Sequence, residues 1–156
     1  MSIDRAREAL SRFGLESRIK EFEVSSATVS LAAEALGTEE CRIAKTLSFL
    51  LPEGPILVVA AGDAKVNNSK FKARFKTKAK MIPFDDVETL IGHGVGGVCP
   101  FGINEGVKVF LDISLKRFST VFPAAGTAAS AVELSIPELE LSSGYTEWID
   151  VTSIPE

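Results

Sequence analysis

Hydrophobic residues recur at helical spacing in the first part of the chain. The apolar positions within residues 3–13 fall on one face of a helix, and Gly14 predicts where that helix ends. Residues 20–24 alternate between polar and apolar side chains, as a short strand does. A second helix is expected to begin after Thr28, a suitable N-cap, and to end at Gly37, a suitable C-cap.

Two strongly apolar runs follow, over residues 46–51 and 56–61. The segment between them, residues 52–55, contains two prolines and a glycine, which are residues that turns favour. Two apolar runs joined by such a segment predict a β-hairpin. This hairpin is the most hydrophobic part of the sequence, so it is expected to lie in the core.

The second half mixes short helices and strands without a regular repeat. We expect a helix capped within residues 67–69, a strand over 79–82, a helix over 85–91, strands over 107–113, 120–122 and 131–134, and a helical turn over 137–141. Trp148 and Ile149 indicate that the C-terminal tail packs against the domain. This order favours an α+β fold, a curled mixed β-sheet or barrel surrounded by short helices, rather than a doubly wound one. The chain shows no repeat or linker, which predicts a single domain over residues 1–156.

Composition limits the class of protein. The chain has 156 residues, of which 46% are hydrophobic and 24% charged, so it can bury a core without disulfides. The longest apolar run, residues 56–62, is too short to cross a membrane. The N-terminus is polar, unlike a secretory signal. Two cysteines, Cys41 and Cys99, form no metal-binding pattern. We therefore expect a cytoplasmic protein with no metal, no cofactor and no membrane partner.

Charge is distributed unevenly along the chain. The net charge is −4, which argues against general nucleic-acid binding. Residues 62–80, however, carry seven basic side chains and one acidic one, and no lysine or arginine follows Arg117. Such a basic segment can steer a polyanion to one face of an otherwise acidic molecule. The alternative is a solvated lysine-rich helix with no partner.

Lys45 is the first candidate for chemistry. It stands among Ile43, Ala44 and Leu47, where the chain enters the apolar hairpin. A lysine whose stem packs among aliphatic side chains becomes a fixed cation, which suits an ester carbonyl, a ribose hydroxyl or a phosphate. The alternative is a lysine at the end of a strand that only extends into water.

The second candidate is the glycine-rich segment 94–102. Its glycines let a ligand approach the main chain, and Pro100 restricts the backbone, so the amides of the turn are held in fixed directions. Amides held in this way can bind a developing oxyanion. A purely structural turn between a helix and a strand explains the same residues.

Three further residues carry groups that could take part in chemistry. Cys99 has no histidine at a recognisable spacing for a nucleophile, and His93 is the single histidine of the chain. Asp112 interrupts an apolar strand, where a buried acid requires a partner, so it is either a site residue or a structural acceptor. The sequence contains no Ser-His-Asp arrangement and no phosphate-binding loop.

The lysine segment and the glycine segment together resemble the paired lysine and Gly-x-x-x-Pro signature of the YbaK/EbsC family, the free-standing relatives of the prolyl-tRNA synthetase editing domain. The similarity extends over residues 25–141, and residues 90–102 carry its closest stretch. The resemblance implies a deacylase that hydrolyses the ester of mischarged tRNA, usually tRNA for proline, with water as the attacking group and no side-chain nucleophile.

The resemblance also implies roles for individual residues. Lys45 and Gly96 are expected to be catalytic, with the lysine holding the terminal adenosine or the ester and the glycine amide facing the aminoacyl group. The remaining predicted contacts are Thr46, Gly97, Val98, Pro100 and Asp112 for the substrate, and Lys65, Lys70, Lys72, Arg74 and Lys76 for tRNA. The pocket is expected between the hairpin and the glycine turn, lined by residues such as Phe49, Val59 and Val98.

Expected partners are tRNA and, in addition, an aminoacyl-tRNA synthetase, but not DNA. Two other functions stay open from the sequence. One is a module that binds tRNA or a synthetase without catalysis. The other is hydrolysis of a different small ester or amide in the same pocket.

Overall fold

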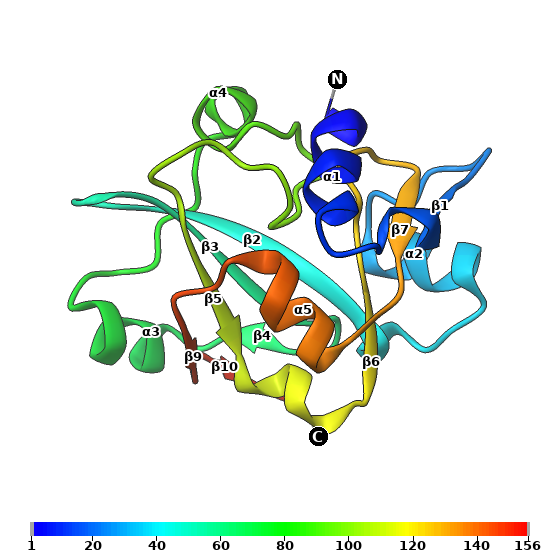
Figure 1. The fold of residues 1–156 in the computed structure, drawn as a ribbon. Helices are drawn as coiled ribbons and strands as arrows, with labels where there is room; N and C mark the ends of the chain where they lie inside the picture. Colours follow the sequence, from blue (N-terminus) through cyan, green and yellow to red (C-terminus); the bar gives the residue numbers. More distant parts are fainter. Residues whose placement is uncertain (1, 156) are drawn as a thin grey trace.

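The computed structural model describes residues 2–155, and its centre is a mixed six-stranded sheet (Figure 1). The strand order is β8-β6-β2-β3-β5-β9. The strands are β1 (Ile19–Glu21), β2 (Ile43–Leu51), β3 (Gly54–Ala61), β4 (Lys65–Val66), β5 (Lys108–Asp112), β6 (Thr120–Pro123), β7 (Ser130–Val132), β8 (Leu134–Ser135), β9 (Glu147–Ile149) and β10 (Thr152–Ser153). The predicted α+β class with a curled mixed sheet is confirmed.

Within residues 2–155, five short α-helices surround the sheet (Figure 1). They are α1 (Ser2–Ser11), α2 (Val29–Leu36), α3 (Asn68–Phe75), α4 (Val87–Ile91) and α5 (Ile136–Ser143). Three of them have a side-chain N-cap. Thr28 accepts from Leu31 N at the start of α2, and Asn67 accepts from Lys70 N at the start of α3. At α5, Ser135 forms a capping box.

The β2–β3 hairpin organises the sheet. Its strands pair antiparallel from Ala44 opposite Ala61 to Leu51 opposite Gly54, as the two apolar runs predict. The strands on either side of the hairpin run parallel to it: β5 pairs with β3, and β6 pairs with β2. Because both faces of the hairpin are covered, its apolar residues can be nearly continuous rather than alternating.

The described residues form a main core cluster, a second cluster on the other side of the hairpin, and a small third cluster of Ala32, Ala33, Ile43 and Phe122. The main cluster contains Leu57, Val59 and Leu111 and packs against helices α1, α4 and α5. The second cluster contains Phe49 and Phe71, whose ring centroids lie 4.8 Å apart, and it packs under α3. Phe71 and Phe75, four residues apart, share one face of α3, and their ring centroids lie 4.7 Å apart.

Two expectations about local structure need correction. Residues 79–82 form no strand, because only Met81 bridges to Phe49. The predicted strand over 131–134 is split into β7 and β8, which pair with different partners, β1 and β6. The tail beyond Ser143 packs against the domain, as Trp148 and Ile149 indicated, and it forms two further strands, β9 and β10.

The C-terminal segment pairs with two different strands, β5 and β4. Strand β9 adds to β5 at one edge of the sheet, and β10 pairs with β4 just before α3. Among residues 2–155, no helix is long and apolar enough to span a membrane.

Candidate functional site

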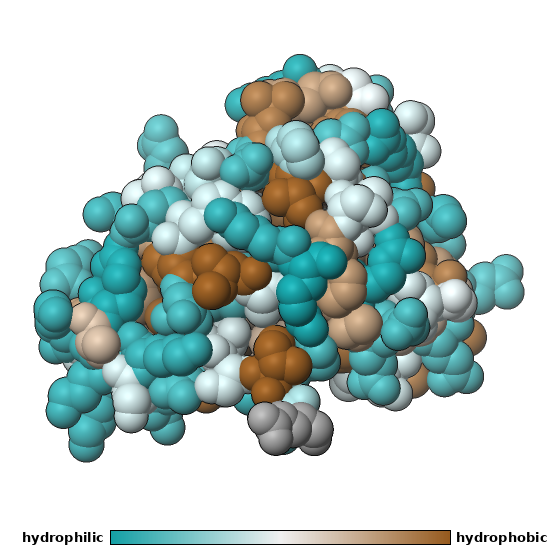
Figure 2. Space-filling view, turned by 90° about the horizontal axis from the view of Figure 1, so that it is seen from below, coloured by the Kyte–Doolittle hydropathy of each residue, from teal (hydrophilic) through white to brown (hydrophobic). Residues whose placement is uncertain are grey.

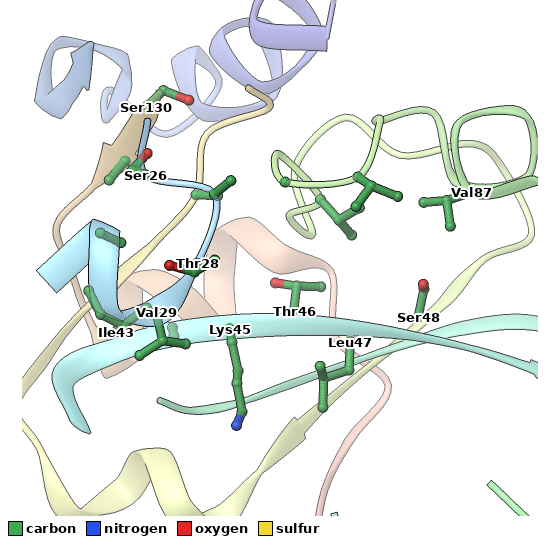
Figure 3. A pocket seen from close by; sticks show the side chains of 18 of the residues that line it. Ser26, Thr28, Val29, Ile43, Lys45, Thr46, Leu47, Ser48, Val87 and Ser130 are labelled. Carbon is green, nitrogen blue, oxygen red and sulfur yellow. The ribbon is translucent and has the colours of Figure 1, made fainter. Parts of the chain in front are cut away.

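A cavity of about 420 Å³ lies over β2 (Figure 3). Its floor comes from β2, one wall from the segment before and at the start of α2, and the other from the segment that runs from residue 82 through α4 to the glycine turn. Side chains that line it include Ser26, Thr28, Val29, Thr46, Ser48, Ile82, Phe84, Val87, Val98, Ala124 and Ser130. This volume falls within the range of pockets that hold small molecules.

Successive residues of β2 point to opposite sides of the strand (Figure 3). Thr46 and Ser48 project into the space between the Thr28 segment and the Val87 segment, whereas Lys45 and Leu47 project the other way. The Thr46 hydroxyl is buried and has no hydrogen-bond partner among the described residues. The Thr46 hydroxyl is therefore closed to solvent as well as unpaired.

Lys45 lines the cavity, but its ammonium lies across the strand from Thr46. The ammonium donates to the carbonyls of Ala64 and of Gly62, the latter at 3.4 Å. Burial lowers the pKa of Lys45, while nearby Asp63 opposes that shift. Because an ammonium has three donors, one proton is left for a ligand oxygen. The ammonium is therefore fixed, but on the side of β2 opposite to the Thr46 and Ser48 side chains.

An ion pair holds the turn that carries these two carbonyls. Arg117 donates to both carboxylate oxygens of Asp63, at 2.6 and 3.0 Å. The hydrogen bond from Arg117 lowers the pKa of Asp63. A two-point contact between guanidinium and carboxylate restricts orientation as well as distance. The position of the Lys45 ammonium therefore depends on residues from three separate parts of the chain.

The glycine turn forms the far wall. Gly96 and Val98 line the cavity, and Gly96 has a φ of 94°, which favours glycine. The Gly96 amide has no acceptor among the described residues. Gly97 lies behind it: a Cβ at this position would be 2.6 Å from the backbone of Gly126 and Thr127. Pro100 is buried and lies beside a different cavity.

Asp112 lies outside the cavity and is fully buried at the end of β5. Its carboxylate accepts from Ser114 N at 3.0 Å, from Val151 N at 2.9 Å and from the Thr152 hydroxyl at 2.7 Å. These contacts connect the sheet to the C-terminal segment. They supply the partners that a buried acid requires.

The structure brings His93 and Cys99 together, a contact that the sequence spacing did not reveal. The Cys99 sulfur lies 3.5 Å from His93 Nε2, which itself lies 2.6 Å from the Phe101 carbonyl. Burial lowers the pKa of His93 and raises the pKa of the Cys99 thiol to about 12. A neutral imidazole whose Nε2 binds a carbonyl cannot deprotonate the thiol. This pair is consistent with a packed core contact.

The basic segment divides into two groups. Lys70 pairs with Asp150 at 3.0 Å, and Arg74 pairs with Glu147 while stacking on Phe75 and Phe110. In contrast, Lys65, Lys72 and Lys76 are exposed and form no ion pair within residues 2–155. Hydrophilic side chains gather at the left edge of Figure 2, the side on which α3 lies in Figure 1.

The expected cavity lining is only partly correct. Val98 lines the cavity, but Val59 is buried in the main core cluster and Phe49 packs on the other side of the hairpin. Sequence reasoning missed Ser26, Val87 and Ser130 as lining residues. No local motif marks them, because they reach the cavity through long-range packing. Groups of metal-ligating residues were not found in the described part of the chain.

Comparison with known proteins agrees with this architecture. Residues 23–141 match the model of the aminoacyl-tRNA editing domain. The uncharacterized protein YwhH of Bacillus subtilis is 49% identical over 153 residues, covering 97% of each chain. The proline–tRNA ligase of Streptococcus sanguinis is 29% identical over 86 residues, which cover 54% of this chain and only 14% of the ligase.

A solved structure also supports similarity to the editing domain. The crystal structure of a candidate trans-editing enzyme for prolyl-tRNA synthetase superposes with a TM-score of 0.87 and 27% identity, and 97% of each chain is covered. The resemblance inferred from the lysine and glycine segments is thereby confirmed. This chain belongs to the aminoacyl-tRNA editing domain family.

Proposed function

We propose that this protein is a trans-acting aminoacyl-tRNA deacylase that hydrolyses mischarged tRNA, with tRNA for proline as the carrier. The observation that carries the proposal is the cavity over β2, which combines a fixed lysine with an unpaired glycine amide in an editing-domain fold. Similarity to proline–tRNA ligases supports the choice of tRNA. A substrate of this kind places the protein in the cytoplasm, and a synthetase is its expected partner.

In the proposed reaction, water attacks the carbonyl carbon of the aminoacyl ester. The bond from that carbon to the 3′ ribose oxygen breaks, the ribose oxygen takes a proton, and the amino acid leaves as a free carboxylate. The Gly96 amide faces the oxygen on which charge develops, and Lys45 holds an oxygen of the terminal nucleotide. Positioning of water and ester by these groups replaces a side-chain nucleophile.

Selection by size follows from the apolar part of the lining. Val87, Val98 and Ala124 restrict the space available to the amino-acid side chain. An apolar pocket discriminates a single methylene by only about 1–3 kcal/mol, so shape alone gives modest selectivity. The cavity is therefore expected to admit small amino acids and to hydrolyse bulkier esters slowly.

The proposal is tested by deacylation of tRNA(Pro) charged separately with alanine, cysteine, serine, threonine and proline. Turnover of at least one mischarged species, with prolyl-tRNA left intact, is the expected result. If no species is hydrolysed above the rate of a buffer control, the assignment as a deacylase of tRNA(Pro) is wrong.

Gly97→Ala is expected to lower kcat/KM by about 100-fold, because a displacement of the loop by an ångström can cost that much. The new methyl group would meet the backbone of Gly126 and Thr127 at 2.6 Å and push the turn away. Gly94→Ala is the matched control, since its nearest neighbour, Glu88, lies 3.6 Å away. Equal activity of the two variants would show that the position of the glycine turn does not affect deacylation.

The exposed lysines favour a second function, tRNA binding without catalysis. We predict that removing both Lys72 and Lys76 weakens tRNA binding and makes the slope of log K against log salt shallower by roughly one for each phosphate that is no longer neutralised. Lys70 and Arg74 are expected to contribute less to tRNA binding, because they already form ion pairs with Asp150 and Glu147 of the C-terminal segment. Filter binding at several salt concentrations measures the slope, with Lys20→Ala as control. An unchanged slope would remove these lysines from the interface.

A further inference from the structure

The mouth of the cavity over β2 is formed by the lining residues that are exposed to solvent. These residues are Ala27, Thr28, Met81, Phe84 and Val95, of which four are hydrophobic and none is charged. Phe84 is 74% exposed, more than any other large hydrophobic side chain among the described residues. The mouth therefore presents a neutral, apolar surface that includes an aromatic ring.

The Phe84 ring has no partner of its own kind in the protein. Within residues 2–155 it takes part in no contact between aromatic rings and in no cation–π contact. Phe84 begins a short 3-10 turn directly before α4, whose residues Val87 and Ile91 are buried. A single exposed hydrophobic side chain is ordinary. Phe84 differs because it shares the mouth of one cavity with exposed Met81 and Val95.

The covalent structure of an aminoacyl-tRNA determines which of its parts reaches this mouth. The ester and the terminal base are attached to the same ribose. When the ester carbonyl lies at the Gly96 amide, only the sugar ring separates it from the base. Gly96 directly follows Val95, a residue of the mouth. The terminal base is thereby placed at the mouth, outside the space that the amino acid occupies.

Charge around the mouth favours a base over a phosphate group beside Phe84. Asp85 and Asp86 directly follow Phe84, are exposed and form no ion pair within residues 2–155, so they repel phosphates. Lys78 and Lys80 are exposed and equally without an ion pair in the described chain, and they lie in the segment that leads to the mouth. Phosphates are therefore attracted to that segment, and the neutral base is left for the ring.

We propose that Phe84 stacks on the terminal base of the tRNA and thereby positions the ribose that carries the ester. This inference rests on the proposed deacylase function and assigns a further binding residue to it. Every base has a flat π-face, and aromatic side chains commonly stack on the bases of single-stranded RNA ends. A fixed ribose restricts the directions from which the ester can meet the Gly96 amide, which raises kcat/KM.

The test compares two substrates that differ only in the terminal base. One is the trinucleotide CCA carrying, as its 3′ ester, the amino acid that the wild type removes from tRNA(Pro). The other is the same ester without the terminal adenine. The wild type is expected to have the higher kcat/KM for the complete substrate, and Phe84→Ala should reduce this preference roughly 5- to 150-fold.

Matched variants separate stacking from other effects. Phe84→Tyr keeps the aromatic face and should keep the preference, whereas Phe84→Leu keeps an apolar side chain without that face and should lose most of it. Leu141→Ala removes another exposed hydrophobic side chain, which lies outside this cavity, and should leave the preference unchanged. A general disturbance of the site would lower hydrolysis of both substrates and leave their ratio unaltered.

The outcomes distinguish failure of this inference from failure of the function on which it rests. If the wild type hydrolyses the esters but Phe84→Ala retains the wild-type preference for the base, only the inference is wrong. If no ester is hydrolysed, calorimetry with stable 3′-alanylamido analogues of the two trinucleotides decides. Tighter binding of the analogue with the base, lost in Phe84→Ala, supports the inference, and the absence of any such difference overturns it.

Discussion

Lys45→Ala is expected to lower kcat/KM for deacylation by about 100- to 1000-fold, the range seen when one fixed electrostatic group is removed from a catalytic site. The reason is that the Lys45 ammonium is held by the carbonyls of Gly62 and Ala64, with one proton left for the substrate. The alanine variant lacks both the charge and the donor. Single-turnover hydrolysis of the reactive mischarged tRNA measures the loss.

Two companion variants separate charge from packing. Lys45→Met keeps the aliphatic stem and removes the ammonium, so it should be as inactive as Lys45→Ala while retaining more of the packing. Lys20→Ala removes an exposed lysine of β1 and should leave activity unchanged. Thermal unfolding and circular dichroism confirm that each variant is folded. A folded Lys45→Ala protein with the wild-type rate would exclude Lys45 from the reaction.

Asp112→Ala is expected to lower the free energy of unfolding by about 3–5 kcal/mol, since it leaves two buried amides without an acceptor. Those amides belong to Ser114 and Val151, and the Thr152 hydroxyl loses its partner as well. The substitution should also release β9 and β10, which pair with the sheet edge and with β4. Urea denaturation measures the change in stability, and amide exchange over residues 147–153 measures the release.

The same position distinguishes a structural role from a role in substrate contact. Asp112→Asn keeps one acceptor oxygen, so its loss of stability should be smaller than that of the alanine variant. At a temperature where Asp112→Asn is fully folded, a purely structural Asp112 predicts activity close to the wild type. Loss of activity in a folded Asp112→Asn protein, without loss of stability, would instead support the substrate contact expected from the sequence resemblance.

Local features of the fold were largely predictable. Thr28 and Gly37 cap α2 as their chemistry indicates, and the two apolar runs form the β2–β3 hairpin. These predictions succeed because a cap or a tight turn depends on residues only a few positions apart. The predicted strand over 79–82 failed for the opposite reason. A strand needs a neighbour along its whole length, and here the contact with β2 is confined to the Met81–Phe49 bridge and two backbone hydrogen bonds beside it, from Leu50 N to Lys80 O and from Ile82 N to Ser48 O.

The candidate site was predictable in its parts but not in its arrangement. The sequence pointed to Lys45, Thr46 and Gly96, and all three line one cavity. The sequence does not tell which side of β2 faces the cavity, so the separation of the Lys45 ammonium from Thr46 emerged only in the structure. The contact of His93 with Cys99 was also missed, because a six-residue separation across a glycine turn has no characteristic spacing.

By itself, the sequence determined the local elements, the α+β class and the family, because caps, turns and the lysine and glycine segments are short-range patterns. Only the tertiary structure decided the partners of the buried and charged groups. Lys45 meets a carbonyl 19 residues away, Asp112 a hydroxyl 40 residues away and Lys70 a carboxylate 80 residues away. No local pattern encodes such contacts, since they form only when the sheet brings distant segments together. The unpaired hydroxyl of Thr46 is a product of the same packing.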